Sequence, residues 1–113
     1  MKKVILDTNF LLTAIKFKVD IFSQLQEYEI YVLDKTLQEL KNKKYEKLAK
    51  ELIERFNVNI IKTSSKKNVD DLLIEYKEYI IATQDKNLKE KLKKAKISTI
   101  SLRQKKYLIE NVL

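Results

Sequence analysis

The sequence predicts an α/β protein: a three-layer αβα sandwich around a central parallel sheet of about five strands. Short apolar segments alternate with longer segments in which apolar residues recur every three or four positions. The first pattern is typical of buried strands and the second of amphipathic helices. Their regular alternation favours right-handed βαβ connections and a parallel sheet covered on both faces. The 113 residues show no linker and no internal repeat, which predicts a single domain over residues 1–113.

Five strands are predicted from short, mostly apolar runs. In chain order they are Val4–Leu6, Ile30–Leu33, Val58–Ile61, Tyr79–Thr83 and Ile97–Ile100. Apolar positions with helical spacing lie between them, at Phe10, Leu11, Ala14 and Ile15; at Ile21, Phe22, Leu25 and Tyr28; at Leu37 and Leu40; at Leu48, Leu52, Ile53 and Phe56; at Leu72, Leu73 and Tyr76; and at Leu88, Leu92 and Ala95. Thr63–Asn68 is expected to be a polar loop. The tail over 103–113 is basic and then apolar, so we expect it to fold back onto the core or, alternatively, to form a dimer contact.

The composition excludes several classes of chemistry. The chain has no cysteine, histidine, glycine or proline. It therefore has no disulfide, no zinc site of the usual kind, no Ser-His or Cys-His nucleophile and no glycine-rich phosphate loop. No apolar run approaches the roughly 18 residues that span a bilayer, and the N-terminus does not read as a signal peptide, so a cytoplasmic protein without a membrane partner is expected.

Acidic residues are predicted to meet at one edge of the sheet. Asp7 directly follows the first strand, and Asp85 follows the fourth by two residues. Glu39 lies early in the helix after the second strand, and Asp70 and Asp71 follow the loop that leaves the third. The carboxyl ends of parallel strands share one edge, which is where open α/β sheets build their active sites. Asp20, Asp34 and Glu51, by contrast, are expected to be ordinary surface or cap residues.

Most of these acids have an alternative explanation in local structure. The sequence Thr36-x-x-Glu39 matches a capping box, in which Glu39 bonds only its own helix start. Asp70, Asp71 and Asp85 suit helix caps or first-turn positions. Asp7 is harder to explain this way, because an acid that interrupts an apolar run costs free energy unless it is paired or coordinated.

A carboxylate cluster without histidine or cysteine favours a hard divalent cation, Mg2+ or Mn2+. Such an ion relieves the mutual repulsion of the acids and promotes phosphodiester hydrolysis. Small polar residues flank the acids, namely Thr8, Asn9 and Thr83. They are expected either to orient the carboxylates or to serve only in local capping and turns.

The charge balance favours a polyanionic partner. Lysine and arginine number 24 against 16 acidic residues, for a net charge of +8. The candidate phosphate contacts are Lys86, Lys89, Lys91, Lys93 and Lys94 on a helix, and Arg103, Lys105 and Lys106 after the last predicted strand. A solvated helix surface is the alternative for the first group.

These residues together resemble the PIN-domain nucleases over essentially the whole chain. The matching stretches are VILDTNFLL at 4–12, VLDKTLQEL at 32–40, VDDLLIEY at 69–76, YIIATQDKNLKEKL at 79–92 and ISTISLRQKKYL at 97–108. The chain is most similar to archaeal PIN proteins that resemble ribosomal-RNA-processing endonucleases. The toxins of toxin–antitoxin pairs are more distant relatives.

The resemblance implies a metal-dependent endoribonuclease that cleaves single-stranded RNA, with a role in rRNA processing. It assigns the catalytic and metal-binding acids to Asp7, Glu39, Asp71 and Asp85, with Asp70 as a competitor of Asp71. Many relatives carry a further acid at the position of Asn87, which is assigned to the surrounding polar shell and leaves a second metal ion in question. Two alternatives follow: a weakened module that binds RNA or assists assembly, and a toxin ribonuclease. The corresponding partners are RNA, a second copy of the chain, an antitoxin or a ribosome-assembly factor.

Overall fold

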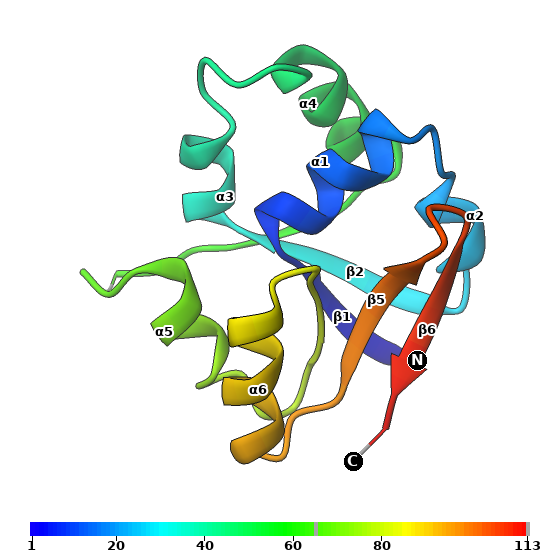
Figure 1. Ribbon diagram of the computed structural model, residues 1–113. Coiled ribbons are helices and arrows are strands. Elements are labelled where there is room, and N and C mark those ends of the chain that lie inside the picture. The colour runs from blue at the N-terminus through cyan, green and yellow to red at the C-terminus, as the bar shows by residue number, and fades with distance from the viewer. Residues whose placement is uncertain (65, 113) are drawn as a thin grey trace.

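One six-stranded sheet organises the computed structural model, which describes residues 1–64 and 66–112 (Figure 1). The strands are β1 (Lys2–Leu6), β2 (Tyr28–Leu33), β3 (Asn59–Ile61), β4 (Ile80–Ala82), β5 (Thr99–Arg103) and β6 (Tyr107–Asn111). The helices are α1 (Thr8–Lys16), α2 (Ile21–Gln24), α3 (Asp34–Glu39), α4 (Glu46–Arg55), α5 (Val69–Leu73) and α6 (Lys86–Lys94). The predicted alternation of strands and helices is confirmed.

Helices cover both faces of the sheet, as Figure 1 shows. Successive residues of a strand point to opposite faces, so Val4 and Leu6 pack with α1, α2 and α4, whereas Ile5 packs with α5 and α6. Two separate apolar clusters result, one on each side of the sheet. The predicted three-layer αβα sandwich is therefore confirmed.

The order of strands places Asp7 at the centre of the sheet. The order is β3-β2-β1-β4-β5-β6, with the first five strands parallel. From β1 the chain moves outward to β2 and β3, and then returns to β4 on the other side of β1. This reversal between β1 and β4 is a topological switch point, the usual location of a ligand site in an open α/β sheet. The amide of Asp7 bonds the carbonyl of Ala82 in β4, with an N···O distance of 2.9 Å.

The five parallel strands that the sequence predicts are confirmed, and the sheet gains a sixth strand at its C-terminal end. Residues of the tail form β6, an antiparallel edge strand paired with β5, rather than only an apolar segment folded onto the core. The turn between them uses positive φ angles at Gln104 and Lys105, 54° and 57°. This geometry is typical of a two-residue hairpin turn, but its usual glycine or asparagine is missing, so the sequence lacked the signal. The side chain of Gln24 braces the turn by bonding the carbonyl of Lys106 and the amide of Leu108.

Some predicted boundaries also shift. β5 begins at Thr99 because Ile97 is still buried against α6 and bonds its last turn through its amide. Tyr79 lies outside β4 and packs edge-on against Tyr31 and Tyr76. Ser65 of the predicted polar loop and Leu113 of the predicted apolar tail lie outside the described residues. In the described part of the chain, no helix has the length and apolar character needed to cross a membrane.

Candidate active site at the carboxyl ends of the strands

Asp7 is a buried carboxylate held by two hydrogen bonds. It follows β1, caps the N-terminus of α1, and only 6% of its surface is exposed. The Thr8 amide donates to Asp7 Oδ1 and the Thr83 hydroxyl donates to Asp7 Oδ2, each at 2.9 Å. Both oxygens are therefore fixed by neighbours, and the position matches the prediction of an acid at the exit of the first strand.

Glu39 is tied to the Asp7 region and not to the start of its own helix. The Thr8 hydroxyl donates to Glu39 Oε1 over 2.5 Å, and its oxygen also lies 3.2 Å from the Thr36 hydroxyl. α3 begins at Asp34, so Thr36 is already inside the helix. The capping-box explanation of Thr36 and Glu39 is therefore wrong, because their side chains meet the first turn of α1 instead.

Asp85 combines local capping with a connection to Asp7. Its Oδ1 accepts hydrogen bonds from the amides of Asn87 and Leu88, at 2.9 and 3.2 Å, so the predicted cap role is confirmed. Its own amide donates to the Thr83 hydroxyl at 3.1 Å, and that hydroxyl donates to Asp7. Thr83 thus links the two acids directly, which is more than a local turn contact.

The two neighbouring aspartates of α5, Asp70 and Asp71, lie in different environments. Asn68 caps this helix by accepting from the Asp71 amide, so neither aspartate is the N-cap and both lie in the first turn. Asp70 is half-buried, and its charge acts on Asp7. Asp71 is exposed and raises only the pKa of its neighbour Asp70. Asp70 is therefore the less exposed member of the pair and the one whose charge raises the pKa of Asp7.

The electrostatics show that negative charge accumulates at this edge. Burial raises the pKa of Asp7 from 3.8 to about 6; hydrogen bonds from Thr83 and Thr8 oppose this, while the charges of Asp70 and Glu39 add to it. The pKa of Asp70 is raised by burial and then by Asp85, with Lys91 acting in the opposite direction. Like charges that share a site favour protonation, and a cation reverses that preference.

The donor set fits a hard cation in chemistry, since every candidate ligand is a carboxylate. The carboxylates of Asp7, Glu39, Asp70 and Asp85 come from four different segments. The charges of Asp70 and Glu39 raise the pKa of Asp7, and those of Asp85 and Glu39 raise the pKa of Asp70. Within residues 1–64 and 66–112, however, no three acidic side chains converge closely enough to form a complete ligand group. The structure therefore places the acids at one edge without assembling them around a single point.

The remaining polar residues occupy different places. Asn9 and Asn87 are both exposed, and only the backbone amide of Asn87 joins the network, through Asp85. The basic hairpin residues Arg103, Lys105 and Lys106 surround the β5–β6 turn, where the Lys105 ammonium lies 4.5 Å from the centre of the Phe17 ring. Lys86 opens α6 beside Asp85. Asp34, expected to be an ordinary residue, ties the end of β2 to that of β3 by accepting two hydrogen bonds from Thr63.

Sequence reasoning did not single out Gln84. Its side chain bonds the backbone of Leu102 twice, accepting from the amide at 2.6 Å and donating to the carbonyl at 3.2 Å. Gln84 thereby extends the contact between the loop after β4 and the end of β5. Its position between Thr83 and Asp85 was the only available signal, because a glutamine in a loop predicts no particular partner.

Comparisons with known proteins agree with this arrangement. A family model described as a PIN like domain matches residues 4–105. Ribonuclease VapC4 of Methanocaldococcus jannaschii is 32% identical to this chain, over 95% of each protein. The solved PIN domain endonuclease Utp24 superposes with a TM-score of 0.76 at 26% identity, covering 98% of this chain and 92% of its own. A domain of a functionally unknown M. jannaschii protein superposes with a TM-score of 0.66 at 15% identity, covering 100% and 99%, and supports the fold alone.

Proposed function

The chain belongs to the PIN-like domain family, and on this premise we propose that it is a metal-dependent endoribonuclease that hydrolyses phosphodiester bonds of single-stranded RNA. The observation that carries the proposal is the buried Asp7 carboxylate, which accepts hydrogen bonds from the Thr8 amide and the Thr83 hydroxyl. The same two threonines contact acids of other elements, because the Thr8 hydroxyl donates to Glu39 and the Thr83 hydroxyl accepts from the backbone amide of Asp85. A fold gains little stability from collecting acids at one edge, so their meeting there supports a functional role. A ribonuclease and an endonuclease among the relatives support the same reaction class.

We propose that Asp7, Glu39, Asp70 and Asp85 hold Mg2+ or Mn2+, with Asp71 at the margin. When bound, such an ion supplies positive charge opposite the phosphodiester and promotes ionisation of the attacking water. Thr83 fixes one oxygen of Asp7 and receives the amide of Asp85, while Thr8 fixes Glu39. These hydroxyls orient the carboxylates, a task that typically accounts for ten- to a hundredfold in metal affinity or activity.

Cleavage by the wild-type protein and by Asp7→Asn tests this proposal. We expect the wild type to cleave an unstructured RNA in the presence of Mn2+ and to be inactive with EDTA. Asp7→Asn is expected to abolish cleavage, because it removes the charge of the most buried acid while keeping its shape. Asp20→Asn provides a matched control, since Asp20 is exposed and caps the distant helix α2.

The site assignment fails if Asp7→Asn cleaves as fast as the wild type while both proteins are folded by circular dichroism. It also fails if Asp20→Asn loses as much activity as Asp7→Asn. RNA is the partner that this proposal requires. A second copy of the chain, an antitoxin and a ribosome-assembly factor stay predictions of the sequence, as does the cytoplasmic location.

A further inference from the structure

One face of the β5–β6 hairpin carries mostly polar side chains, together with one tyrosine and one isoleucine. Because side chains alternate along a strand, every second residue of each strand shares this face. Cross-strand pairing aligns them as Thr99 with Asn111, Ser101 with Ile109, and Arg103 with Tyr107. We call these six residues the hairpin face.

The opposite side of the same hairpin is packed against the core. Ile100, Leu102 and Leu108 belong to the apolar cluster formed with α1 and α2. The hairpin face is only partly covered: Arg103 and Asn111 are exposed and Tyr107 is 42% exposed, whereas Thr99 is buried. It is a strip of sheet that begins at the end of β5 nearest the acids and runs toward the other end of the strand.

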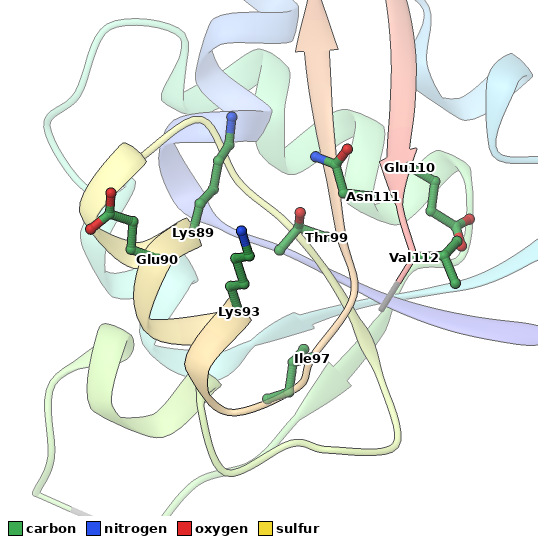
Figure 2. Close-up of a pocket in the computed structure, with 8 residues that line it drawn as sticks. All are labelled: Lys89, Glu90, Lys93, Ile97, Thr99, Glu110, Asn111 and Val112. Atoms are coloured by element: carbon green, nitrogen blue, oxygen red, sulfur yellow. The ribbon is translucent and has the colours of Figure 1, made fainter.

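A pocket of about 550 Å³ lies at the far end of this strip, between α6 and the hairpin (Figure 2). Lys89 and Lys93 enter it from α6, and Thr99 and Asn111 enter it from the strands. In Figure 2 the two ammonium groups point to the same side of α6, toward the hairpin. The volume is in the range of pockets that hold a small organic group such as a nucleotide.

Two acids, Glu90 and Glu110, line this pocket together with its two lysines. Among residues 1–64 and 66–112, neither Lys89 nor Lys93 forms an ion pair, and the side chains of Thr99 and Asn111 form no hydrogen bond. Burial and the charge of Lys86 lower the pKa of Lys89. Glu110 borders the pocket, but its carboxylate already accepts from the Tyr28 hydroxyl at 2.6 Å and pairs with Lys2 at 3.4 Å. The lysines are therefore available to an anion.

The strip is continuous with the acid edge. Gln84, between Thr83 and Asp85, bonds both backbone groups of Leu102, which is the neighbour of Arg103. The near end of the hairpin face is thus fixed beside the acids, and Lys86 opens α6 on the same side. Three lysines of α6, at 86, 89 and 93, follow at helical spacing along about 10 Å of helix from the acid edge into the pocket.

We propose that the hairpin face and its pocket bind the segment of single-stranded RNA that continues away from the cleavage site. Phosphates contact Arg103, Lys89 and Lys93, and one base stacks on Tyr107. This inference rests on the proposed endoribonuclease function. A basic groove that tracks the backbone, combined with an aromatic ring that accepts any base, is the usual solution for single strands bound without sequence preference.

Binding of a fluorescently labelled 12-nucleotide oligouridylate, measured by anisotropy in metal-free buffer, tests the face. Tyr107→Ala is expected to weaken binding roughly tenfold, while Tyr107→Phe keeps the wild-type affinity because the stacking surface is retained. Lys93→Glu is expected to weaken binding severalfold and to flatten the dependence of affinity on salt. Lys47→Glu makes the same change of charge on α4, which covers the other face of the sheet, and serves as the matched control.

Equal losses for Lys93→Glu and Lys47→Glu would show that only net charge matters and would overturn the proposal. Unchanged binding by Tyr107→Ala in a folded protein would also overturn it. Uridine monophosphate is a further arm: if it binds as tightly as the 12-mer, the pocket is a site for a free nucleotide and not for an RNA strand.

An NMR titration with the same oligouridylate places the ligand without any substitution. The backbone amides of Thr99 and Asn111 are expected to shift together with those at the acid edge; shifts confined to the acid edge contradict the inference. The outcome is separable from that of the proposed function. If Asp7→Asn cleaves RNA as fast as the wild type while the hairpin face still binds RNA, only the nuclease assignment is refuted. If cleavage is normal but this face binds no RNA, only this inference is refuted.

Discussion

The acid edge and the hairpin face lie next to each other but are built in opposite ways. At the acid edge, Asp7 is buried and hydroxyl groups hold its oxygens in place. On the hairpin face, Arg103 and Tyr107 are exposed, and Lys93 of the adjoining helix α6 is exposed as well. The comparison teaches that chemistry at a single bond needs fixed groups, while binding a variable strand needs charge and an aromatic surface that adapt.

The two regions also differ in charge: the acid edge is negative, whereas the hairpin face is positive, like the chain as a whole. The net charge is +8, yet the acid edge gathers enough negative charge to raise the pKa of Asp7 to about 6. A positive surface around a negative centre attracts a polyanion such as RNA. A bound cation then offsets the negative charge of the acids, so that the phosphate can approach them. Variants of each region should therefore separate turnover from affinity.

After the loss of cleavage expected for Asp7→Asn, the largest expected effect is on the α5 pair, where Asp70→Asn should reduce Mn2+-dependent cleavage roughly a thousandfold. Loss of one acid removes several kcal/mol of stabilisation of the developing charge. RNA affinity in metal-free buffer should not fall, because the hairpin face is untouched. Asp71→Asn is the matched control, since it makes the same change one residue away on an exposed side chain, and it should lower the rate less than threefold.

A reversed order of these two variants would return the role to Asp71, as the sequence preferred. A loss of RNA affinity with unchanged turnover in Asp70→Asn would break the comparison itself, because the acid edge would then be acting as a binding surface. Single-turnover rates measured beside equilibrium binding distinguish these outcomes.

The second effect concerns stability and pH. The pKa of Asp7 is raised from 3.8 to about 6 by burial, so the folded protein holds this proton more firmly than the unfolded chain. The stability this provides is present below about pH 4 and is lost as the pH rises through about 6. The difference corresponds to about 3 kcal/mol. Metal-free Asp7→Asn, which is neutral at every pH, should therefore be more stable than the wild type at pH 7.5 and no more stable at pH 4.

Urea denaturation of both proteins in EDTA at the two pH values measures this difference. Addition of Mn2+ at pH 7.5 should stabilise the wild type and leave Asp7→Asn nearly unchanged, since a ligand that binds only the folded state raises its stability. If the wild type is more stable than Asp7→Asn at pH 7.5 without metal, the hydrogen bonds to the Asp7 carboxylate already offset the cost of burying its charge.

A smaller effect is expected from Thr83, which joins Asp7 to Asp85. Thr83→Val keeps the volume and removes the hydroxyl, so it should lower activity roughly tenfold through loss of orientation. Thr83→Ser retains the hydroxyl and should restore most of the rate. Equal activity in Thr83→Val and the wild type would show that packing alone positions Asp7. The rate should fall through turnover, with the KM for RNA unchanged, because the hairpin face still supplies the binding.

The sequence predicted the parts of this molecule that depend on local pattern. Asp7 stands out in the sequence because a carboxylate interrupts an apolar run. The structure confirms that this carboxylate is buried. Glu39 looked like half of a capping box, since sequence spacing does not reveal that Thr8 of another element would meet its carboxylate. The sequence preferred Asp71 over Asp70, because it does not reveal that Asp70 is the less exposed of the two in the fold.

The hairpin escaped prediction for a different reason. Its strands carry mixed polar and apolar residues. Gln104 and Lys105 adopt positive φ angles, which are unusual for these residue types and so could not be predicted from them. The side chain of Gln24, far away in the sequence, stabilises that turn. Long-range contacts of this kind decide edge strands, so the sequence indicated the basic residues of the surface that we propose for RNA but not the strand β6 that carries Tyr107.

The smallest expected effect is at Asn87, where Asn87→Asp adds a carboxylate to the first turn of α6. The residue is exposed, and its amide already bonds Asp85, so the new charge lies beside an existing acid and at a helix N-terminus that favours it. We expect Mn2+ affinity or cleavage to rise a few-fold. Asn57→Asp is the control, because it makes the same change just before β3, at the opposite edge of the sheet. An isothermal titration with Mn2+ that shows no difference between the two variants would mean that Asn87 lies outside the metal's reach. A gain in Asn87→Asp alone would instead extend the acid edge into the first turn of α6, between Lys86 and Lys89 of its basic strip.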